Sequence, residues 1–110
     1  MAKTLDFKAL KKQYMTVKLA DENNTVLMIT TPTKSILDGF LSMRDSMEDG
    51  SLGDEAINEL YEIVAKIMSH NKGGVKISKD EIEELMDYED IIIFIRAYTE
   101  FISEVTGSKN

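Results

Sequence analysis

The sequence predicts an α+β fold that is mostly α: an N-terminal β-hairpin followed by about four helices, in a single domain over residues 1–110. Apolar and polar residues alternate over 14–20, and a second short apolar run follows at 25–30, as is typical of paired strands. From residue 32 onward, apolar residues recur at helical spacing. A chain of 110 residues can bury one core, with 1–31 as the β-hairpin region and 32–107 as the helical region.

The two strands are joined by a short polar turn. In YMTVKLA, residues 14–20, alternation gives one apolar face, formed by Met15, Val17 and Leu19. DENN at 21–24 is turn material, because Asp and Asn tolerate left-handed backbone conformations. TVLMIT at 25–30 is the second strand, and the preceding segment 6–12 is expected to be a short helical turn or a lead-in.

The only proline of the chain lies in TPTKSI, directly after the second strand. Proline suits the first helical position, because it has no N–H to lose there and its φ is preset for a helix. Thr31 is then expected to be the N-cap and Pro32 the first helical residue. This stretch therefore predicts a switch from strand to helix, and nothing in it supports catalysis.

The first two helices follow from their apolar spacing. The first is expected to end near Gly50, and its apolar stripe comprises Ile36, Leu37, Phe40, Leu41 and Met47, with Met43 at the edge. A loop over 50–53 follows, and Asp54 is expected to cap the second helix, whose stripe is Ile57, Leu60, Tyr61, Val64, Ile67 and Met68. The NKGG sequence at 71–74 should end it, with a glycine as left-handed cap.

The last two helices each begin at a capping residue. Ser78 with Glu81 forms a capping box that opens a short helix, and its inward residues are Ile82, Leu85 and Met86. Asp87 is expected to cap the final helix, which should end at Gly107. The run IIIFI at 91–95 is short and β-branched, as in a strand. Helical spacing nevertheless continues for ten residues beyond it, and this favours a helix with the stripe Ile91, Phe94, Ile95, Tyr98, Phe101, Ile102 and Val105.

Charge and composition restrict the classes of partner. Residues 36–110 carry seven basic and seventeen acidic side chains, so this part would repel phosphates and nucleic acid is not expected as a partner. A basic or amphipathic protein partner fits better, and the alternative is that the charge only provides solubility. The chain has no cysteine, which excludes disulfides and thiolate chemistry. No signal peptide and no apolar run long enough for a bilayer is seen, so we expect a cytoplasmic protein without membrane contact.

No catalytic, metal-binding or cofactor-binding constellation can be assembled from the residues. The single histidine, His70, is at a helix end, where its ring suits the helix dipole. The segment 45–56 resembles a calcium loop only in part, because Met47 and Ala56 stand at positions that need oxygen ligands. The acidic clusters lie at predicted helix N-termini, where negative charge is stabilising. We therefore expect a protein that is not an enzyme and has no cofactor.

Three apolar residues are candidates for contact with a partner. Met43 and Met47 lie one turn apart near the end of the first helix, and methionine suits adaptable binding surfaces. Ile92 lies off the main stripe of the last helix, opposite the core-facing Phe94 and Tyr98. These residues are candidates for self-association or for contact with a helical partner. The alternative is that they are buried in the core beneath the hairpin.

The chain as a whole resembles the small tail assembly chaperones of long-tailed bacteriophages and prophages. The resemblance is one of overall pattern, and it covers KTLDFKALKKQYMTVKL, TTPTKSILDGF, DEAINELYEIVAKIMSHNKGGVKIS and DYEDIIIFIRAYTEFISEV. It implies a non-enzymatic assembly factor that coats the tape measure protein before the tail tube polymerises around it. It also implies location in the host bacterial cytoplasm and absence from the mature virion.

Many members of that family are made in two forms by translational frameshifting, and the extension of the longer form helps to recruit the tail tube protein. This chain, ending in VTGSKN, would correspond to the short form. An alternative from another class is a structural virion component, such as a tail completion or head–tail connector protein. A small enzyme is the third reading, and no combination of nucleophile, base and orienting group supports it.

Overall fold

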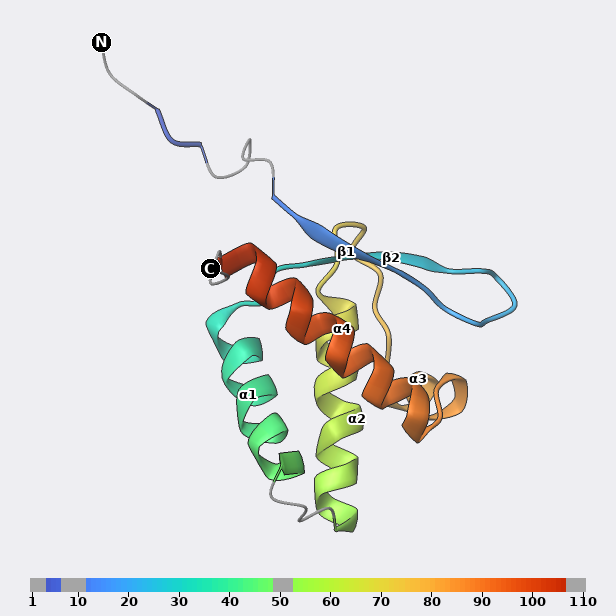
Figure 1. Ribbon diagram of the computed structural model, residues 1–110. Helices are drawn as coiled ribbons and strands as arrows, with labels where there is room; N and C mark the ends of the chain where they lie inside the picture. Colours follow the sequence, from blue (N-terminus) through green and yellow to red (C-terminus); the bar gives the residue numbers. More distant parts are fainter. Residues whose placement is uncertain (1–3, 7–11, 49–52, 107–110) are drawn as a thin grey trace.

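The computed structural model describes residues 4–6, 12–48 and 53–106, and these confirm the predicted α+β architecture. A two-stranded antiparallel hairpin is followed by four helices in one compact globule (Figure 1). The helices α1 and α2 run side by side, α4 crosses in front of them, and the hairpin lies across the upper end of α2 (Figure 1). The predicted turn or lead-in at 6–12 falls largely outside the described residues.

The hairpin consists of β1 (Tyr14–Lys18) and β2 (Val26–Thr30). Tyr14 is opposite Thr30 and Lys18 is opposite Val26, so the odd-numbered residues Met15, Val17, Leu27 and Ile29 share one face. Leu27 and Ile29 are fully buried on that face, as the alternation predicts. In the turn, the Asp21 carboxylate accepts hydrogen bonds from the Thr25 backbone N–H and hydroxyl, and these bonds lower the pKa of Asp21.

A third chain segment, 70–72, continues the sheet on the other side of β2. The Thr30 N–H donates to the His70 carbonyl over 3.0 Å, and the Lys72 N–H donates to the Met28 carbonyl over 2.9 Å. The expected glycine cap of the preceding helix is therefore wrong. Its C-cap is His70, and the left-handed Gly74 (φ +72°) serves the following turn instead, because 70–72 must leave the helix extended to reach β2.

The first helix, α1 (Lys34–Glu48), begins two residues later than expected. The Thr33 hydroxyl accepts a hydrogen bond from the Ile36 N–H over 3.4 Å, and the Thr33 carbonyl accepts one from the Leu37 N–H. Thr33 therefore occupies the N-cap, and Pro32 precedes it instead of taking the first helical position. The proline still separates strand from helix, because it restricts Thr31 to extended conformations.

The remaining helices are α2 (Asp54–Ser69), α3 (Lys79–Leu85) and α4 (Tyr88–Thr106). Asp54 is the first residue of α2 rather than its cap, and Gly53 at the N-cap makes no side-chain bond. Ser78 and Glu81 form the predicted capping box of α3. Asp87 caps α4 as predicted, since its carboxylate accepts from the Asp90 N–H over 2.8 Å and the Asp90 carboxylate accepts in return from the Asp87 N–H.

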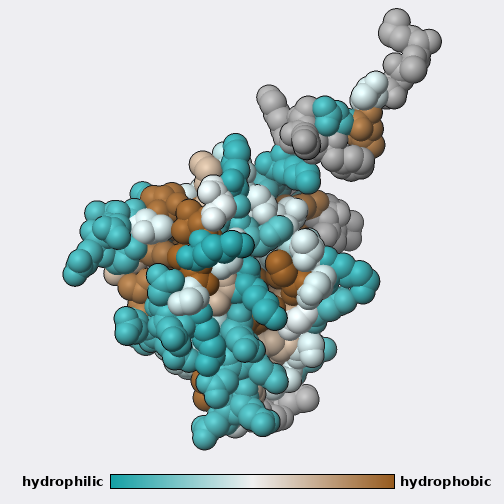
Figure 2. All heavy atoms as spheres, turned by 180° about the vertical axis from the view of Figure 1, so that it is seen from behind, coloured by the Kyte–Doolittle hydropathy of each residue, from teal (hydrophilic) through white to brown (hydrophobic). Residues whose placement is uncertain are grey.

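The core lies where α1, α2, α4 and the inner face of the hairpin meet. Gly39 lies where α1 is close to α2, since a Cβ there would be 3.1 Å from the Ile63 Cδ1 atom. The largest fully buried side chains come from every one of these elements and from α3, and they are Tyr98, Phe40, Leu27, Ile29, Leu60, Ile67, Met68, Ile82, Ile91 and Val64. The rear of the molecule is mostly hydrophilic, with apolar side chains in separate patches (Figure 2).

Candidate partner-binding surface

An open hollow lies between α1 and α4, and two of the three predicted partner residues meet there. Met47 contributes from α1 and Ile92 from α4, although they are 45 positions apart in the sequence. The hollow has a volume of about 710 Å³. Its lining is mixed apolar and polar and comprises Arg44, Met47, Ile92, Ile95, Arg96, Thr99 and Glu100.

Helical spacing explains how each helix contributes to this hollow. On α4, Ile92, Ile95, Arg96 and Thr99 follow one another at i, i+3, i+4 and i+7, which places them along one side of the helix. On α1, Arg44 and Met47 are three residues apart and lie on the side that borders α4. Ile92 is half-buried beside the buried Ile95, so it borders the core instead of pointing away from it.

Met43, the third predicted partner residue, belongs to the core. Only 8% of its surface is exposed, and it does not line this hollow. Conversely Leu41, which was expected in the core stripe, is exposed. At about 100° per residue, Phe40, Met43 and Met47 all fall within roughly 40° of Ile36, whereas Leu41 lies well outside that sector. Met43 therefore lies within the stripe that faces the core.

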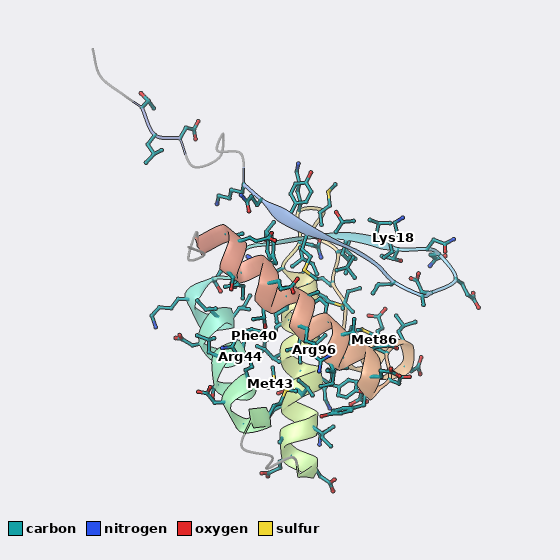
Figure 3. The ribbon with its side chains drawn as sticks, in the orientation of Figure 1. Lys18, Phe40, Met43, Arg44, Met86 and Arg96 are labelled. Atoms are coloured by element: carbon teal, nitrogen blue, oxygen red, sulfur yellow. The ribbon has the colours of Figure 1, made fainter. Side chains whose placement is uncertain are left out.

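Two arginines at this hollow were not singled out from the sequence. Arg44 is half-buried on α1, and Arg96 is exposed on α4 (Figure 3). They are the only arginines of the chain, in which the other eleven basic residues are lysines. The sequence alone could have pointed to these two residues, because each arginine lies beside an apolar stripe in an otherwise acidic region.

A second, smaller groove of about 320 Å³ separates β1 from α3 and the start of α4. Apolar residues supply much of its wall, and the most exposed of the large ones is Ile93, which is 57% accessible. Ile93 therefore presents more apolar surface than Ile92, its neighbour in sequence. The two isoleucines point into different hollows, so they can be compared directly by mutation.

The single histidine has a structural role, at the point where α2 ends beside β2. His70 ends α2, and its carbonyl accepts bonds from the backbone and hydroxyl of Thr30. The described residues contain no group of three or more His, Asp or Glu side chains that could hold a metal ion. None of the described helices combines the length and the apolarity needed to cross a membrane.

Comparison of the chain with protein-family models, curated proteins and solved structures finds no match.

Proposed function

We propose that this protein is a phage tail assembly chaperone, which binds the tape measure protein in the host cytoplasm before the tail tube polymerises. The observation that carries the proposal is the meeting of Met47 and Ile92 at one open hollow between α1 and α4. A helix laid in such a hollow buries apolar side chains without unfolding the chaperone. The overall resemblance of the sequence to that family supports the same role.

The composition of the surface suits a factor that acts transiently and is then released. A net charge of −7 keeps the free protein soluble while the apolar side chains of the hollow are uncovered. Methionine and isoleucine side chains at the hollow make non-directional contacts and can adapt to several similar helical segments. A tape measure protein is long and largely helical, so it would offer many such segments to successive copies.

Co-purification tests the proposal. The protein is co-expressed with the tape measure protein of the same phage, as wild type and as Ile92→Asp and Ile93→Asp variants. Ile92→Asp should remain folded and lose the tape measure protein, because a charge would replace an apolar side chain of the hollow. Ile93→Asp adds the same charge to the neighbouring, more exposed position outside this hollow and should keep binding.

Failure of the wild-type protein to co-purify with the tape measure protein would overturn the proposal. Mass spectrometry of purified phage particles distinguishes the structural alternative. A chaperone should be absent from finished particles, whereas a tail completion or connector protein should be present at a fixed copy number.

A further inference from the structure

The two arginines of the hollow give it a charge opposite to that of the surrounding protein. Residues 36–110 contain seventeen acidic and only seven basic side chains, yet both arginines of the chain line this one hollow. They come from different helices, Arg44 from α1 and Arg96 from α4 (Figure 3). Among the lining residues that the structure describes, Glu100 is the only acidic one, so the described arginines outnumber the described carboxylates there.

Neither arginine is used in an ion pair within the described part of the chain. Two ion pairs within that part are Lys34 with Asp38 and Lys79 with Glu83, each between residues one helical turn apart. The Nε atom of Arg44 is buried and has no hydrogen-bond acceptor among the described residues. A buried donor without an acceptor is unfavourable, so an acceptor that a partner brings to Arg44 would be stabilising. Arg96 is exposed and is accessible to the same acceptor.

The chemistry of arginine narrows the choice of acceptor. Guanidinium groups present a planar fork of N–H donors that matches a carboxylate in a bidentate arrangement. A nucleic acid would supply many phosphates, and the seventeen acidic side chains of residues 36–110 would repel them, whereas a single carboxylate can pair with the two arginines. A single carboxylate carried between apolar side chains fits both the arginines and the apolar part of the lining, Met47, Ile92 and Ile95.

We infer that the hollow binds an acidic amphipathic helix of a partner protein, with a Glu or Asp carboxylate on Arg44 and Arg96 and apolar side chains on Met47 and Ile92. This inference rests on the proposed function and specifies the segments of the tape measure protein that are bound. Those segments carry a carboxylate beside an apolar stripe. The arginines therefore select the bound segment, while the apolar contacts supply adaptable area.

The direct test uses a pair of synthetic helical peptides at about 150 mM salt, where long-range charge effects are screened. Both peptides carry leucine at every third or fourth position, and one has glutamate beside the leucines where the other has glutamine. Binding is followed by NMR at the arginine Nε–Hε signals and at the Ile92 methyl groups. The two arginine signals can be assigned with Arg44→Lys and Arg96→Lys variants, because the chain has no other arginine.

The glutamate peptide should shift both arginine signals and the Ile92 methyl signals, and the glutamine peptide should bind about tenfold more weakly. Arg96→Gln should weaken binding of the glutamate peptide by a similar factor. Arg96→Lys should have an intermediate affinity, because it keeps the charge and loses the planar fork of N–H donors. Lys66→Gln is the matched control, since it removes one positive charge from α2 outside the hollow and should leave the affinity unchanged.

Equal affinity for the two peptides, or no binding of either, would overturn the inference. So would arginine shifts that appear when the protein alone is concentrated, because the occupant would then be a second copy. Co-purification with the tape measure protein distinguishes failure of this inference from failure of the proposed function. If wild type and Arg96→Gln retain the tape measure protein equally, the inference fails alone; if wild type retains none, the proposed function fails and the peptides still decide the inference.

Discussion

The Phe40 ring meets the Tyr98 ring edge to face, with centroids 5.1 Å apart and ring planes at 86°, and this pair joins α1 to α4. Both side chains are almost fully buried. Tyr98 also stacks on Phe94, at 5.8 Å, and contacts the ring of Phe101. The partner hollow lies between the same two helices, so its shape depends on this aromatic cluster.

Truncation of Phe40 should therefore be strongly destabilising. We expect Phe40→Ala to lower the free energy of unfolding by about 3–5 kcal/mol, because it leaves a cavity and removes the ring contact. Urea unfolding followed by circular dichroism measures the loss. Leu41→Ala is the control, because this neighbouring side chain is exposed, and its cost should stay below about 1 kcal/mol. Similar losses for the two variants would contradict the assigned packing of α1.

Burial of Tyr98 makes stability depend on alkaline pH. Burial raises the pKa of Tyr98 from 10.0 to about 12. The unfolded chain then loses this proton at a lower pH than the folded chain. The contribution of Tyr98 is fully present below pH 10, and it falls between pH 10 and 12. The urea midpoint of wild type should fall more steeply over this window than that of Tyr98→Phe. Tyr88→Phe, at an exposed position, should keep the wild-type slope, and parallel curves for all three proteins would contradict the prediction.

Local patterns were sufficient to predict the class of fold and most of the elements. Alternation identified both strands, because a sheet with one buried face repeats every two residues. The capping residues Ser78 and Asp87 were identified correctly, since each acts on backbone groups within its own first turn. In α4 the helical spacing outweighed the β-branched run at 91–95, and the structure has a helix there.

Features that depend on contacts between distant residues were not predicted. The extension of the sheet by residues 70–72 requires α2 to end beside β2, which no local pattern reports. The N-cap was assigned to Thr31 instead of Thr33, because both threonines flank the proline and only the path of the chain distinguishes them. Leu41 was expected in the core and is exposed, whereas Met43 was expected at the edge of the stripe and is buried. The spacing of apolar residues alone does not say which side of the helix faces the core.

The candidate site was predicted in part for the same reason. Met47 and Ile92 were selected one helix at a time, and their meeting depends on how α4 crosses α1. A crossing geometry follows from the packing of complete helix faces and cannot be read from either stripe alone. The arginines were overlooked because a single positive residue on an acidic helix normally indicates only a solvated position.

The two threonines beside the proline provide a test of where α1 begins. Thr33→Ala removes the side-chain acceptor of the Ile36 N–H and should cost about 0.5–1 kcal/mol. Thr31→Ala removes no hydrogen bond from that helix end and should cost less. Chemical denaturation of both variants measures the difference. A larger loss for Thr31→Ala would restore Thr31 as the cap.

Asn71 holds the turn that places residues 70–72 beside β2. Its Nδ2 group donates to the Met68 and Val75 carbonyls, each over 2.7 Å, and its Oδ1 accepts from the Val75 N–H over 2.9 Å. Asn71→Ala should lower the free energy of unfolding by about 1–3 kcal/mol. Hydrogen exchange should accelerate at the Lys72 amide, which donates to the Met28 carbonyl. Asn23→Ala, at an exposed position in the hairpin turn, is the control, and unchanged exchange in Asn71→Ala would contradict this role.

Substitutions of Met43 and Met47 should differ in their effects on stability and on binding, although the two residues are one turn apart on the same helix. Met43 is 8% exposed, so Met43→Ala should cost about 2–5 kcal/mol in the free energy of unfolding. Met47 is half-buried at the hollow, and Met47→Ala should cost about 1 kcal/mol or less. Thermal melting measures both losses.

If the hollow between α1 and α4 receives the tape measure protein, the variant that loses less stability, Met47→Ala, should lose more binding. At a temperature where both variants are folded, Met47→Ala should retain less tape measure protein than wild type, because it removes apolar area from the hollow. Met43→Ala, which changes no residue lining the hollow, should bind like wild type per folded molecule. If Met43→Ala loses binding while Met47→Ala keeps it, the partner instead contacts the α1–α2 side of the molecule, where Met43 lies.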